Sequence, residues 1–476
     1  MAFYDSFLKY NEKIAILDDK LQSISYMELN DLCLEVGKVI SKRALVFCFC
    51  ENSIGSVCGY IAFLYNQVVP VLLDRHIEVG LRKNLIDIYQ PDYFYIPKDL
   101  QDEFSEYECI WQDRDYVLLK AERKFEDRLY HELALLLTTS GSTGSPKLVR
   151  QSYLNIQSNA ESIAEYLEID GTERPITTLP MNYTYGLSII NSHILCGATI
   201  LVTNHTLMNR DFWAFFKEAE ATSFGGVPYT YEILKKLRFF RMDLPSLRYM
   251  TQAGGKLAPE LHKEFAEYAE EKEKKFIVMY GQCEATARMA YLPYERALEK
   301  YGSMGIAIPG GRLELVNVNG ELVTEPDVVG ELVYYGPNVT LGYAQNIEDL
   351  KKSDERFGRL ETGDMAKRDK DGFFYIVGRK KRFLKVYGNR VNLDETERLI
   401  KQFLKDCDSA CGGVDDKLYV FITDESKELQ EKIRHFLAEK TGLHPSAFTV
   451  KYIEQIPKNE AGKTLYRKLE EFYDEF

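Results

Sequence analysis

Strand-like and helix-like segments alternate along the whole chain, and this alternation limits the possible fold more than any other feature of the sequence. The apolar run 133–137 leads into a Ser- and Gly-rich segment, beyond which Ser152 can cap an amphipathic helix. Pro259 opens a second helical pattern, and the strand-like run 276–279 follows it. We therefore expect an α/β protein built on mostly parallel sheets flanked by helices.

The composition changes near Lys367, where a charged stretch punctuated by glycines runs to Gly388. One helical pattern, stopped at Gly442, and several short strands come after it. This change predicts a large N-terminal domain at residues 1–380, a hinge near Lys381 and a small α+β C-terminal domain at residues 381–476. Ligands of open α/β sheets bind at the carboxyl ends of strands, where the polar segments after residues 137 and 279 fall.

The charge balance excludes some partners. The 476 residues include 60 Lys and Arg against 73 Asp and Glu, a net charge of −13 with no long basic run. We therefore expect neither a nucleic-acid surface nor binding to an anionic membrane. Phosphate ligands remain compatible with this charge, because a few lysines and backbone amides can hold them.

Two further features predict a cytoplasmic location. The first residues lack the charged and apolar regions of an export signal, and the most apolar stretch, Ser53–Tyr65, is too short to span a bilayer. The nine cysteines form no recognisable zinc-binding pattern. Buried free thiols in a reducing compartment are the simplest interpretation.

Residues 139–147, Thr-Ser-Gly-Ser-Thr-Gly-Ser-Pro-Lys, have the composition of a phosphate-binding loop. The glycines allow the backbone to approach an anion, the hydroxyls and amides can donate to phosphate oxygens, and Lys147 adds a positive charge. The spacing does not fit a Walker A loop. A flexible surface loop is the alternative interpretation, which the expected position between a strand and a capped helix disfavours.

Four more segments follow this loop, and together the five resemble the motifs of the adenylate-forming (AMP-binding) superfamily, which includes acyl- and aryl-CoA synthetases, peptide-synthetase adenylation domains and luciferases. They are Tyr-Gly-Gln-Cys-Glu at 280–284, Thr-Gly-Asp at 362–364, Gly-Arg-Lys-Lys-Arg-Phe-Leu-Lys at 378–385 and Pro-Lys-Asn-Glu-Ala-Gly-Lys at 457–463. Each segment alone is a weak signal, but the five occur in the family's order. The resemblance extends over essentially the whole chain.

The resemblance implies a role for each matched residue. Glu284 would hold Mg²⁺ against ATP phosphates, Asp364 and Arg379 would bind the ribose, and Tyr280 would stack on the adenine. The expected nucleotide-binding residues are Thr139, Ser140, Gly141, Ser142, Thr143, Gly144, Lys147, Gly254, Gly255, Lys256, Tyr280, Gly281, Gln282, Cys283, Asp364 and Arg379. At Cys283 the family pattern has threonine, and a thiol is a poorer hydrogen-bond donor than a hydroxyl.

The family also implies catalytic lysines on a small, mobile C-terminal domain. Lys463 would stabilise the transition state in which the acid attacks the α-phosphate, and Lys385 would serve the second half-reaction. Lys381 matches the family's hinge residue. We count Lys463, Lys385 and Glu284 as the expected catalytic residues.

The resembled activity is the ATP-dependent conversion of a carboxylic acid to acyl-AMP and PPi, followed by transfer to a thiol. Tyr183, Tyr185 and Gly186 are expected in the acyl pocket, with Tyr229 nearby in motif order, which favours an aryl or short- to medium-chain acid. This segment lacks the carboxylate that amino-acid-activating members carry, and an unpaired buried ammonium costs several kcal/mol. The thiol could belong to CoA or to the phosphopantetheine of an acyl or peptidyl carrier protein.

Three alternatives remain open at this stage. The chain could be a stand-alone amino-acid adenylation enzyme, or a degenerate relative that binds a nucleotide as a sensor. A kinase that passes phosphate to an acid would release ADP instead of AMP and PPi. The expected ATP and Mg²⁺, and a CoA or phosphopantetheine acceptor, apply to the ligase interpretation.

Overall fold

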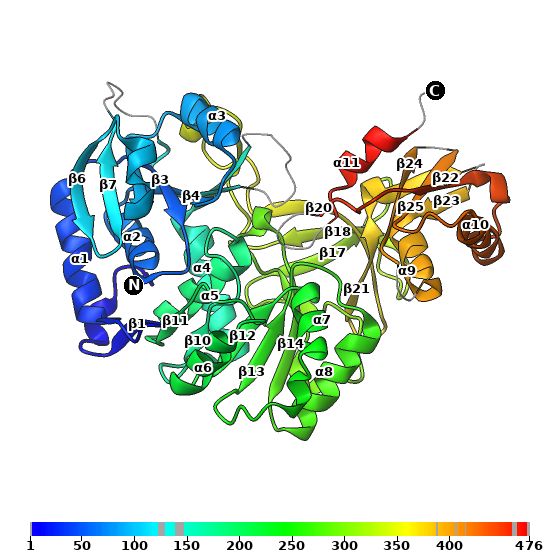
Figure 1. Ribbon diagram of the computed structural model, residues 1–476, viewed down its shortest axis with the longest axis horizontal. Helices are drawn as coiled ribbons and strands as arrows, with labels where there is room; N and C mark the ends of the chain where they lie inside the picture. Colours follow the sequence, from blue (N-terminus) through cyan, green and yellow to red (C-terminus); the bar gives the residue numbers. More distant parts are fainter. Residues whose placement is uncertain are drawn as a thin grey trace. The chain divides into compact units, whose positions relative to one another are not determined.

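The computed structural model describes residues 2–121, 129–138, 147–386, 389–404, 407–414, 416–458 and 464–473. Its chain divides into two compact units (Figure 1). The first unit comprises Met1–Leu313 and Tyr334–Leu360, and the second comprises Glu314–Val333 and Glu361–Phe476. The predicted boundary at residue 380 remains a prediction, because contacts within the chain do not establish which part moves as a domain.

A nine-stranded sheet forms one half of the first unit. Its five central pairs, from β14 to β1, are parallel, and the pairs at both margins are antiparallel. In spatial order the strands are β16 (Ile306–Ala307), β15 (Ala290–Tyr291), β14 (Lys275–Tyr280), β13 (Tyr249–Gln252), β12 (Ser223–Gly226), β10 (Pro175–Ile176), β11 (Ile200–Val202), β1 (Ile14–Asp18) and β2 (Ser23–Ser25).

An eight-stranded sheet forms the other half of this unit. Its order is β19 (Gly342–Ala344), β9 (Leu148–Ser152), β8 (Leu133–Thr138), β4 (Val69–Asp74), β3 (Leu45–Cys50), β5 (Tyr93–Pro97), β7 (Tyr116–Lys120) and β6 (Glu108–Asp113). The strands from β8 to β5 are parallel, and both margins are again antiparallel. The α/β class with large helix-flanked sheets is confirmed.

Helices fill the space between the two sheets. One continuous core cluster joins four helices to strands of both sheets: α1 (Tyr26–Val39), α2 (Ile54–Tyr65), α4 (Tyr153–Leu167) and α5 (Thr184–Leu195). Successive residues of β3 alternate between this cluster and a second one that includes α3 (Val79–Tyr89). Because successive side chains point to opposite faces of a sheet, β3 is buried on both sides.

The outer face of the nine-stranded sheet is packed mainly by aromatic rings. The helices α6 (Arg210–Glu218), α7 (Pro228–Lys236) and α8 (Pro259–Glu271) supply rings such as Tyr231 and Phe265, which pack with Phe276 of β14. Aromatic pairs of this kind add specific geometry to the burial of apolar area. No helix in the described parts of the chain is both long and apolar enough to cross a membrane.

The second unit contains three sheets. A four-stranded sheet has the order β17 (Arg312–Val316), β18 (Gly330–Tyr335), β20 (Arg359–Arg368) and β21 (Phe374–Arg379), and its first three strands include the residues at which the division between the units falls. A second sheet pairs β22 (Phe383–Val386) with β23 (Asn389–Asn392). A third consists of β24 (Ser409–Val414), β25 (Lys417–Ile422) and β26 (Phe448–Tyr452). The helices α9 (Leu393–Phe403) and α10 (Lys427–Thr441) pack on one face of the third sheet, and α11 (Tyr466–Leu469) contributes Leu469 to the other.

Candidate active site

The carboxyl ends of β13 and β14 place two of the predicted segments side by side. These strands are parallel neighbours, with Gln252 opposite Val278. The chain therefore leaves the same edge of the sheet at residues 253–256 and again at residues 281–284. Two polar segments that are far apart in sequence are brought together, as the alternation of strands and helices predicts.

The turn after β13 brings the expected nucleotide-binding residue Gly254 beside Tyr183 of the expected acyl pocket. Gly254 has a φ of +82°, a conformation that favours glycine, and a side chain there would begin 2.6 Å from the hydroxyl oxygen of Tyr183. The buried side-chain amide of Gln252 donates to the carbonyl oxygen of Gly255 at 2.9 Å. Lys256 is exposed at the end of this turn.

Glycine is required for steric reasons after β14. An ideal Cβ built on Gly281 would overlap the carbonyl oxygen of Ala287, although no positive φ is involved. Tyr280 is half-buried just before it, and the side-chain amide of Gln282 donates to the Tyr280 hydroxyl at 3.2 Å. The segment therefore folds back closely on the residues that follow it.

Glu284 lies on the short 3-10 helix Cys283–Ala285 and is held at both its side chain and its backbone. The Tyr343 hydroxyl donates to Glu284 Oε1 at 2.7 Å. The carbonyl oxygen of Glu284 accepts from Thr340 Oγ1 at 3.0 Å and from Arg356 Nη1 at 3.0 Å. Burial and the adjacent Glu284 carboxylate both raise the pKa of Tyr343, which therefore keeps its proton and remains a donor.

Lys147 joins the same cluster through strand pairing. It immediately precedes β9, which pairs antiparallel with β19 so that Val149 lies opposite Tyr343. The Lys147 ammonium lies 3.2 Å from the centre of the Tyr343 ring, and the guanidinium carbon of Arg356 lies 4.6 Å from it. Two predicted residues, Lys147 and Glu284, are thus brought together by Tyr343, which the sequence analysis did not single out.

Tyr343 and Arg356 have no local sequence signal that marks them as site residues. Tyr343 follows a glycine on an ordinary short strand, and Arg356 lies in a charged turn. Only the long-range pairing of β19 with β9 brings them to Glu284. A sequence search could have found them only by asking which residues pair with the strand after the predicted phosphate loop.

Cys283 lies at the base of the predicted phosphate loop. Its sulfur is 4.0 Å from the carbonyl oxygen of Thr138, the residue at which β8 ends, and its side chain is half-buried. Residues 139–144 of the loop lie outside the described residues. The same holds for Lys463, and the side chains of Lys381 and Lys385 are likewise not described.

Asp364 and Arg379 meet within the second unit. They lie opposite each other on the antiparallel strands β20 and β21, and Arg379 Nε is 3.1 Å from Asp364 Oδ1. Asp364 is buried, whereas Arg379 is 65% exposed. The structure thus brings together the two residues expected to bind one sugar.

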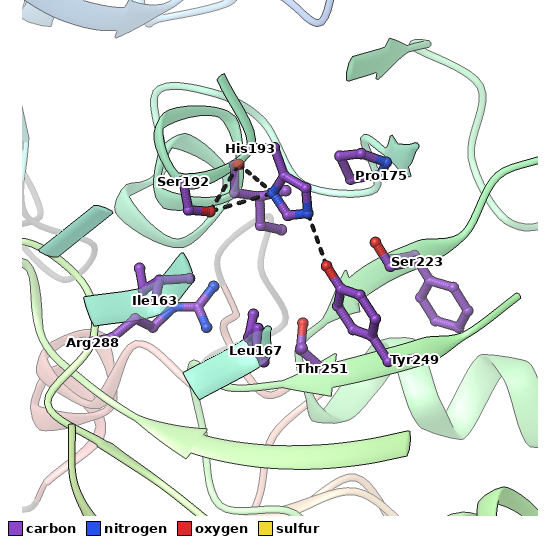
Figure 2. Close-up of a pocket in the computed structure, with 11 residues that line it drawn as sticks. Ile163, Leu167, Pro175, Ser192, His193, Ser223, Tyr249, Thr251 and Arg288 are labelled. Atoms are coloured by element: carbon purple, nitrogen blue, oxygen red, sulfur yellow. Dashed lines mark hydrogen bonds between the residues drawn. The ribbon is translucent and has the colours of Figure 1, made fainter. Parts of the chain in front are cut away.

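None of the expected acyl residues lines the small cavity beside them, but Tyr185 contacts two residues that do, Thr251 and Arg288. Tyr185 is buried, and its hydroxyl donates to the carbonyl oxygen of Thr251 at 2.8 Å, whereas Tyr229 is 54% exposed and forms no buried wall. Gly186 faces the carbonyl oxygen of Pro180 too closely for any side chain. Figure 2 shows the cavity, of about 10 Å³, lined by Ile163, Leu167, Pro175, Ile189, Ser192, His193, Ser223, Phe224, Tyr249, Thr251 and Arg288.

Two nitrogen-containing side chains, those of His193 and Arg288, line the cavity. Burial lowers the pKa of His193 to about 4, so its imidazole is neutral at physiological pH. Its Nδ1 faces the carbonyl oxygen of Ile189 at 2.7 Å, and its Nε2 lies 2.8 Å from the Tyr249 hydroxyl (Figure 2). This geometry assigns the proton to Nδ1 and makes Nε2 the acceptor from Tyr249.

Among known proteins, the chain is similar in sequence to CoA ligases. The chain is 27% identical to an oxalate–CoA ligase of Arabidopsis thaliana over 69% of its own length and 65% of the relative's. It is 26% identical to a 2-succinylbenzoate–CoA ligase of Bacillus cereus over 92% of its own length and 95% of the relative's. It therefore spans slightly less than two thirds of the first of these relatives and nearly all of the second.

The fold is shared with solved structures. O-succinylbenzoate coenzyme A synthetase from Bacillus subtilis in complex with AMP superposes with a TM-score of 0.77 at 20% identity, with 98% of each chain covered. ATP-bound MatB from Rhodopseudomonas palustris gives a TM-score of 0.78 at 20% identity, with 99% of each chain covered. Residues 3–344, which include the segments 139–147 and 280–284, match the AMP-binding enzyme family. The chain belongs to the AMP-binding enzyme family.

Proposed function

We propose that this chain is an AMP-forming acid–thiol ligase. A carboxylate oxygen attacks the α-phosphorus of ATP, forming acyl-AMP and releasing PPi. A thiol then attacks the acyl carbon, forming a thioester and releasing AMP and the thiol proton. Membership of the AMP-binding family supports the first step, and the names of its CoA-ligase relatives support the second.

The observation that carries the proposal is the cluster of Glu284, Tyr343 and Lys147 at the carboxyl edge of the sheets. Glu284 Oε1 is oriented by the Tyr343 hydroxyl, and Lys147 supplies a positive charge beside it. A single positioned carboxylate suits Mg²⁺, which takes its remaining ligands from phosphates and water. Glu284 would hold the ion, and the bound ion would neutralise phosphate charge.

The nucleoside would be held by the residues that the family's motifs assign to it. The turn 253–256 offers backbone groups to the adenine, and the half-buried ring of Tyr280 offers a face for stacking. The Asp364–Arg379 pair offers an acceptor and a fixed set of donors suited to ribose hydroxyls. The hydroxyl and glycine residues 139–144 would cradle the phosphates.

The C-terminal lysines complete the proposal. Lys463 would act in adenylation and Lys385 in thioester formation, with residues 381–476 acting as a mobile domain that turns at Lys381. The support is the match of both lysines to the family's motifs, which in family members lie on opposite faces of one small domain. One active site can use both in turn only if that region moves.

The acid is proposed to be an aryl or short- to medium-chain acid. The expected acyl segment, residues 182–188, contains no carboxylate that could pair with a substrate ammonium, and neither does the described lining of the cavity beside it, which weighs against α-amino acids. CoA is the proposed acceptor, and a carrier-protein phosphopantetheine is the alternative, because both present the same thiol. A cytoplasmic location belongs to the same proposal.

Product analysis tests the proposed function. Purified protein is incubated with MgATP, CoA and a panel of carboxylic acids, and nucleotides are separated by ion-exchange chromatography. We expect the wild type to form AMP and PPi in equal amounts, and only when an acid is present. The Glu284→Gln variant should form both products at a strongly reduced rate. ADP as product would show a kinase, and nucleotide binding without turnover would show a sensor.

A further inference from the structure

Arg288 is a buried arginine whose charge is not balanced within the described residues. Its exposed fraction is 1%, and neither Nε nor Nη2 has a hydrogen-bond partner. Only Nη1 is engaged, by the Tyr166 hydroxyl at 3.2 Å and by contact with the sulfur of Met279. No carboxylate in the described parts of the chain forms an ion pair with it. Burying a guanidinium in this way is costly, since its charge is removed from bulk solvent without an ionic partner.

The free side of this guanidinium faces the small cavity shown in Figure 2. Arg288 lines the cavity, where it lies across from Thr251 and Tyr249 (Figure 2). Its guanidinium carbon lies 4.3 Å from the centre of the Tyr185 ring, so the ring face supplies part of its environment. Because His193 is neutral, Arg288 is the formal cation of the described cavity lining.

A series of aromatic contacts outside the cavity lining joins Arg288 to the turn after β13. The Tyr185 ring centre is 6.3 Å from that of Tyr183, and the Tyr183 hydroxyl faces Gly254 in the turn after β13. Arg288 itself is four residues beyond Glu284 in the same segment after β14. An acid whose reacting carboxylate lies beside this turn would therefore point its far end toward Arg288.

We infer that Arg288 recognises a second anionic group, a distal carboxylate, at the far end of the acid, so that the substrate class is dicarboxylic acids. This inference rests on the proposed ligase function and assigns the residue that selects its substrate. The cavity of about 10 Å³ has room for about one water molecule. Only the terminal oxygen of the acid needs to enter it, and that oxygen would meet Nε and Nη2.

The cost of the unpaired charge makes the inference specific. A buried cation without an ionic partner lowers the free energy of unfolding of the ligand-free protein. The same cation increases the affinity for an anion that reaches it. If the arginine served only in packing, its substitution would instead lower the free energy of unfolding. Stability and acid preference therefore separate the two roles.

Matched pairs of acids test the preference. PPi release is measured with α,ω-dicarboxylic acids of increasing length and with monocarboxylic acids of the same carbon number, for the wild type and for Arg288→Met. We expect the wild type to favour the best dicarboxylic acid by on the order of 10²-fold in kcat/KM. Arg288→Met should lose this preference and favour the monocarboxylic acid. Arg288→Lys should retain part of it, because the charge remains.

A second readout does not depend on turnover. Arg288→Met should melt at the same temperature as the wild type or higher, because an unpaired buried charge has been removed. In the presence of AMP, the best dicarboxylic acid should raise the melting temperature of the wild type but not that of Arg288→Met. Arg312→Met is the control: Arg312 also lies over a ring, 4.2 Å from the centre of Tyr335, but it is exposed and outside the cavity. It should leave the acid preference unchanged.

The outcomes separate this inference from the proposed function. Efficient PPi release with monocarboxylic acids, unchanged in Arg288→Met, would overturn the role of Arg288 and leave the ligase proposal intact. A lower melting temperature for Arg288→Met with an unchanged preference would show a packing role. Absence of PPi release with every acid would overturn the proposed function, and with it the inference.

Discussion

The thiol of Cys283 stands where the family pattern has a threonine, between the predicted phosphate loop and Glu284. Its sulfur is 4.0 Å from the Thr138 carbonyl oxygen, which is a weak contact. A threonine hydroxyl there would be a firmer donor to a phosphate. We predict that Cys283→Thr keeps or raises adenylation activity, by up to about tenfold, mainly through a lower apparent KM for MgATP.

Initial rates of PPi release at varied MgATP measure this effect. Cys283→Ala is the matched control, because it removes the thiol without adding a donor and should not lower KM. A clear loss of activity in Cys283→Thr would mean that the thiol has a role of its own.

Tyr343 provides the sharpest test of the site that strand pairing assembles. Tyr343→Phe removes the hydroxyl that donates to Glu284 and keeps the ring beneath Lys147. Because a hydrogen bond to a charged group is worth about 1.5–3 kcal/mol, we expect kcat/KM for MgATP to fall by roughly 10- to 100-fold. Tyr335→Phe is the control: it removes a solvent-exposed hydroxyl that accepts from Arg359 Nε at 3.3 Å, and it should leave kcat/KM for MgATP nearly unchanged. Equal rates for Tyr343→Phe and the wild type would contradict the proposed orientation of Glu284.

Two buried histidines make stability depend on pH. Burial lowers the pKa of both His193 and His262 from 6.5 to about 4. Between these values the unfolded chain binds protons that the native protein does not, so the free energy of unfolding falls as the pH drops from about 6.5 to about 4. The full loss is on the order of 3 kcal/mol for each histidine.

Thermal melting across this range measures the dependence. In the wild type, the backbone N–H of Gly302 donates to His262 Nδ1 at 3.0 Å. The His262→Gln variant keeps a side-chain acceptor for this N–H. This variant should lose less stability than the wild type between pH 6.5 and pH 4. If the wild type and His262→Gln lose the same stability between pH 6.5 and pH 4, His262 is not held neutral in the native protein.

At the scale of elements, the loop after β14 depends on the absence of a side chain at Gly281. Gly281→Ala would force the Ala287 carbonyl to move, and this movement would displace Arg288 and the 3-10 helix that carries Glu284. We expect a loss of stability of several kcal/mol or a misplaced site without ATP turnover. Gly310→Ala is the control: it has a φ of +78° but no atom within 4 Å of its Cβ, so only backbone strain of about 1–2 kcal/mol applies. Similar melting temperatures for both variants would contradict the close approach at Gly281.

Elements with strong local signals were predicted correctly from the sequence. Ser152 caps α4 through a bond from Asn155 N–H, Pro259 opens α8, and Gly442 ends α10 with a φ of +71°. The expected strand before Tyr280 is β14. Each of these signals lies within the element or next to it, which is why periodicity and capping residues were enough.

Other elements needed the tertiary structure. The sequence analysis placed the phosphate loop between a strand and the helix after Ser152 and identified no strand after the loop, whereas β9 (Leu148–Ser152) lies there and pairs with β8 and β19. The helix α9 was also missed, although it buries Ile400 against the third sheet of the second unit. Such short elements are stabilised by partners distant in sequence. Arg288 was missed for the same reason, because its burial and its unpaired nitrogens are visible only in the folded chain.

At the scale of the whole molecule, the proposed reaction divides into two halves that different lysines serve. Lys463→Ala should lower the rate of adenylation on the order of 10²- to 10³-fold, the effect of losing one positioned donor, and should leave thioester formation from supplied acyl-AMP largely intact. Lys385→Ala should show the opposite pattern. PPi release and thioester formation from acyl-AMP are measured separately for each variant. Equal damage to both half-reactions would contradict the division of roles.

The hinge prediction is tested separately. Proline fixes φ and removes a backbone N–H, so Lys381→Pro should restrict the backbone at the proposed turning point. Adenylation should survive while thioester formation falls, as expected if only the second half-reaction requires the turn. A variant that loses neither half-reaction would place the hinge elsewhere.

The central claim is that the acid carboxylate attacks the α-phosphorus and that a thiol then displaces AMP. The most direct measurement uses an acid labelled with ¹⁸O in the reacting carboxylate, with MgATP and CoA, followed by mass spectrometry of the nucleotide product. We predict that one ¹⁸O appears in AMP, because the attacking oxygen stays on the α-phosphate when the thiol takes the acyl group. Label in inorganic phosphate with ADP as the nucleotide product, or AMP without label, would contradict the claim.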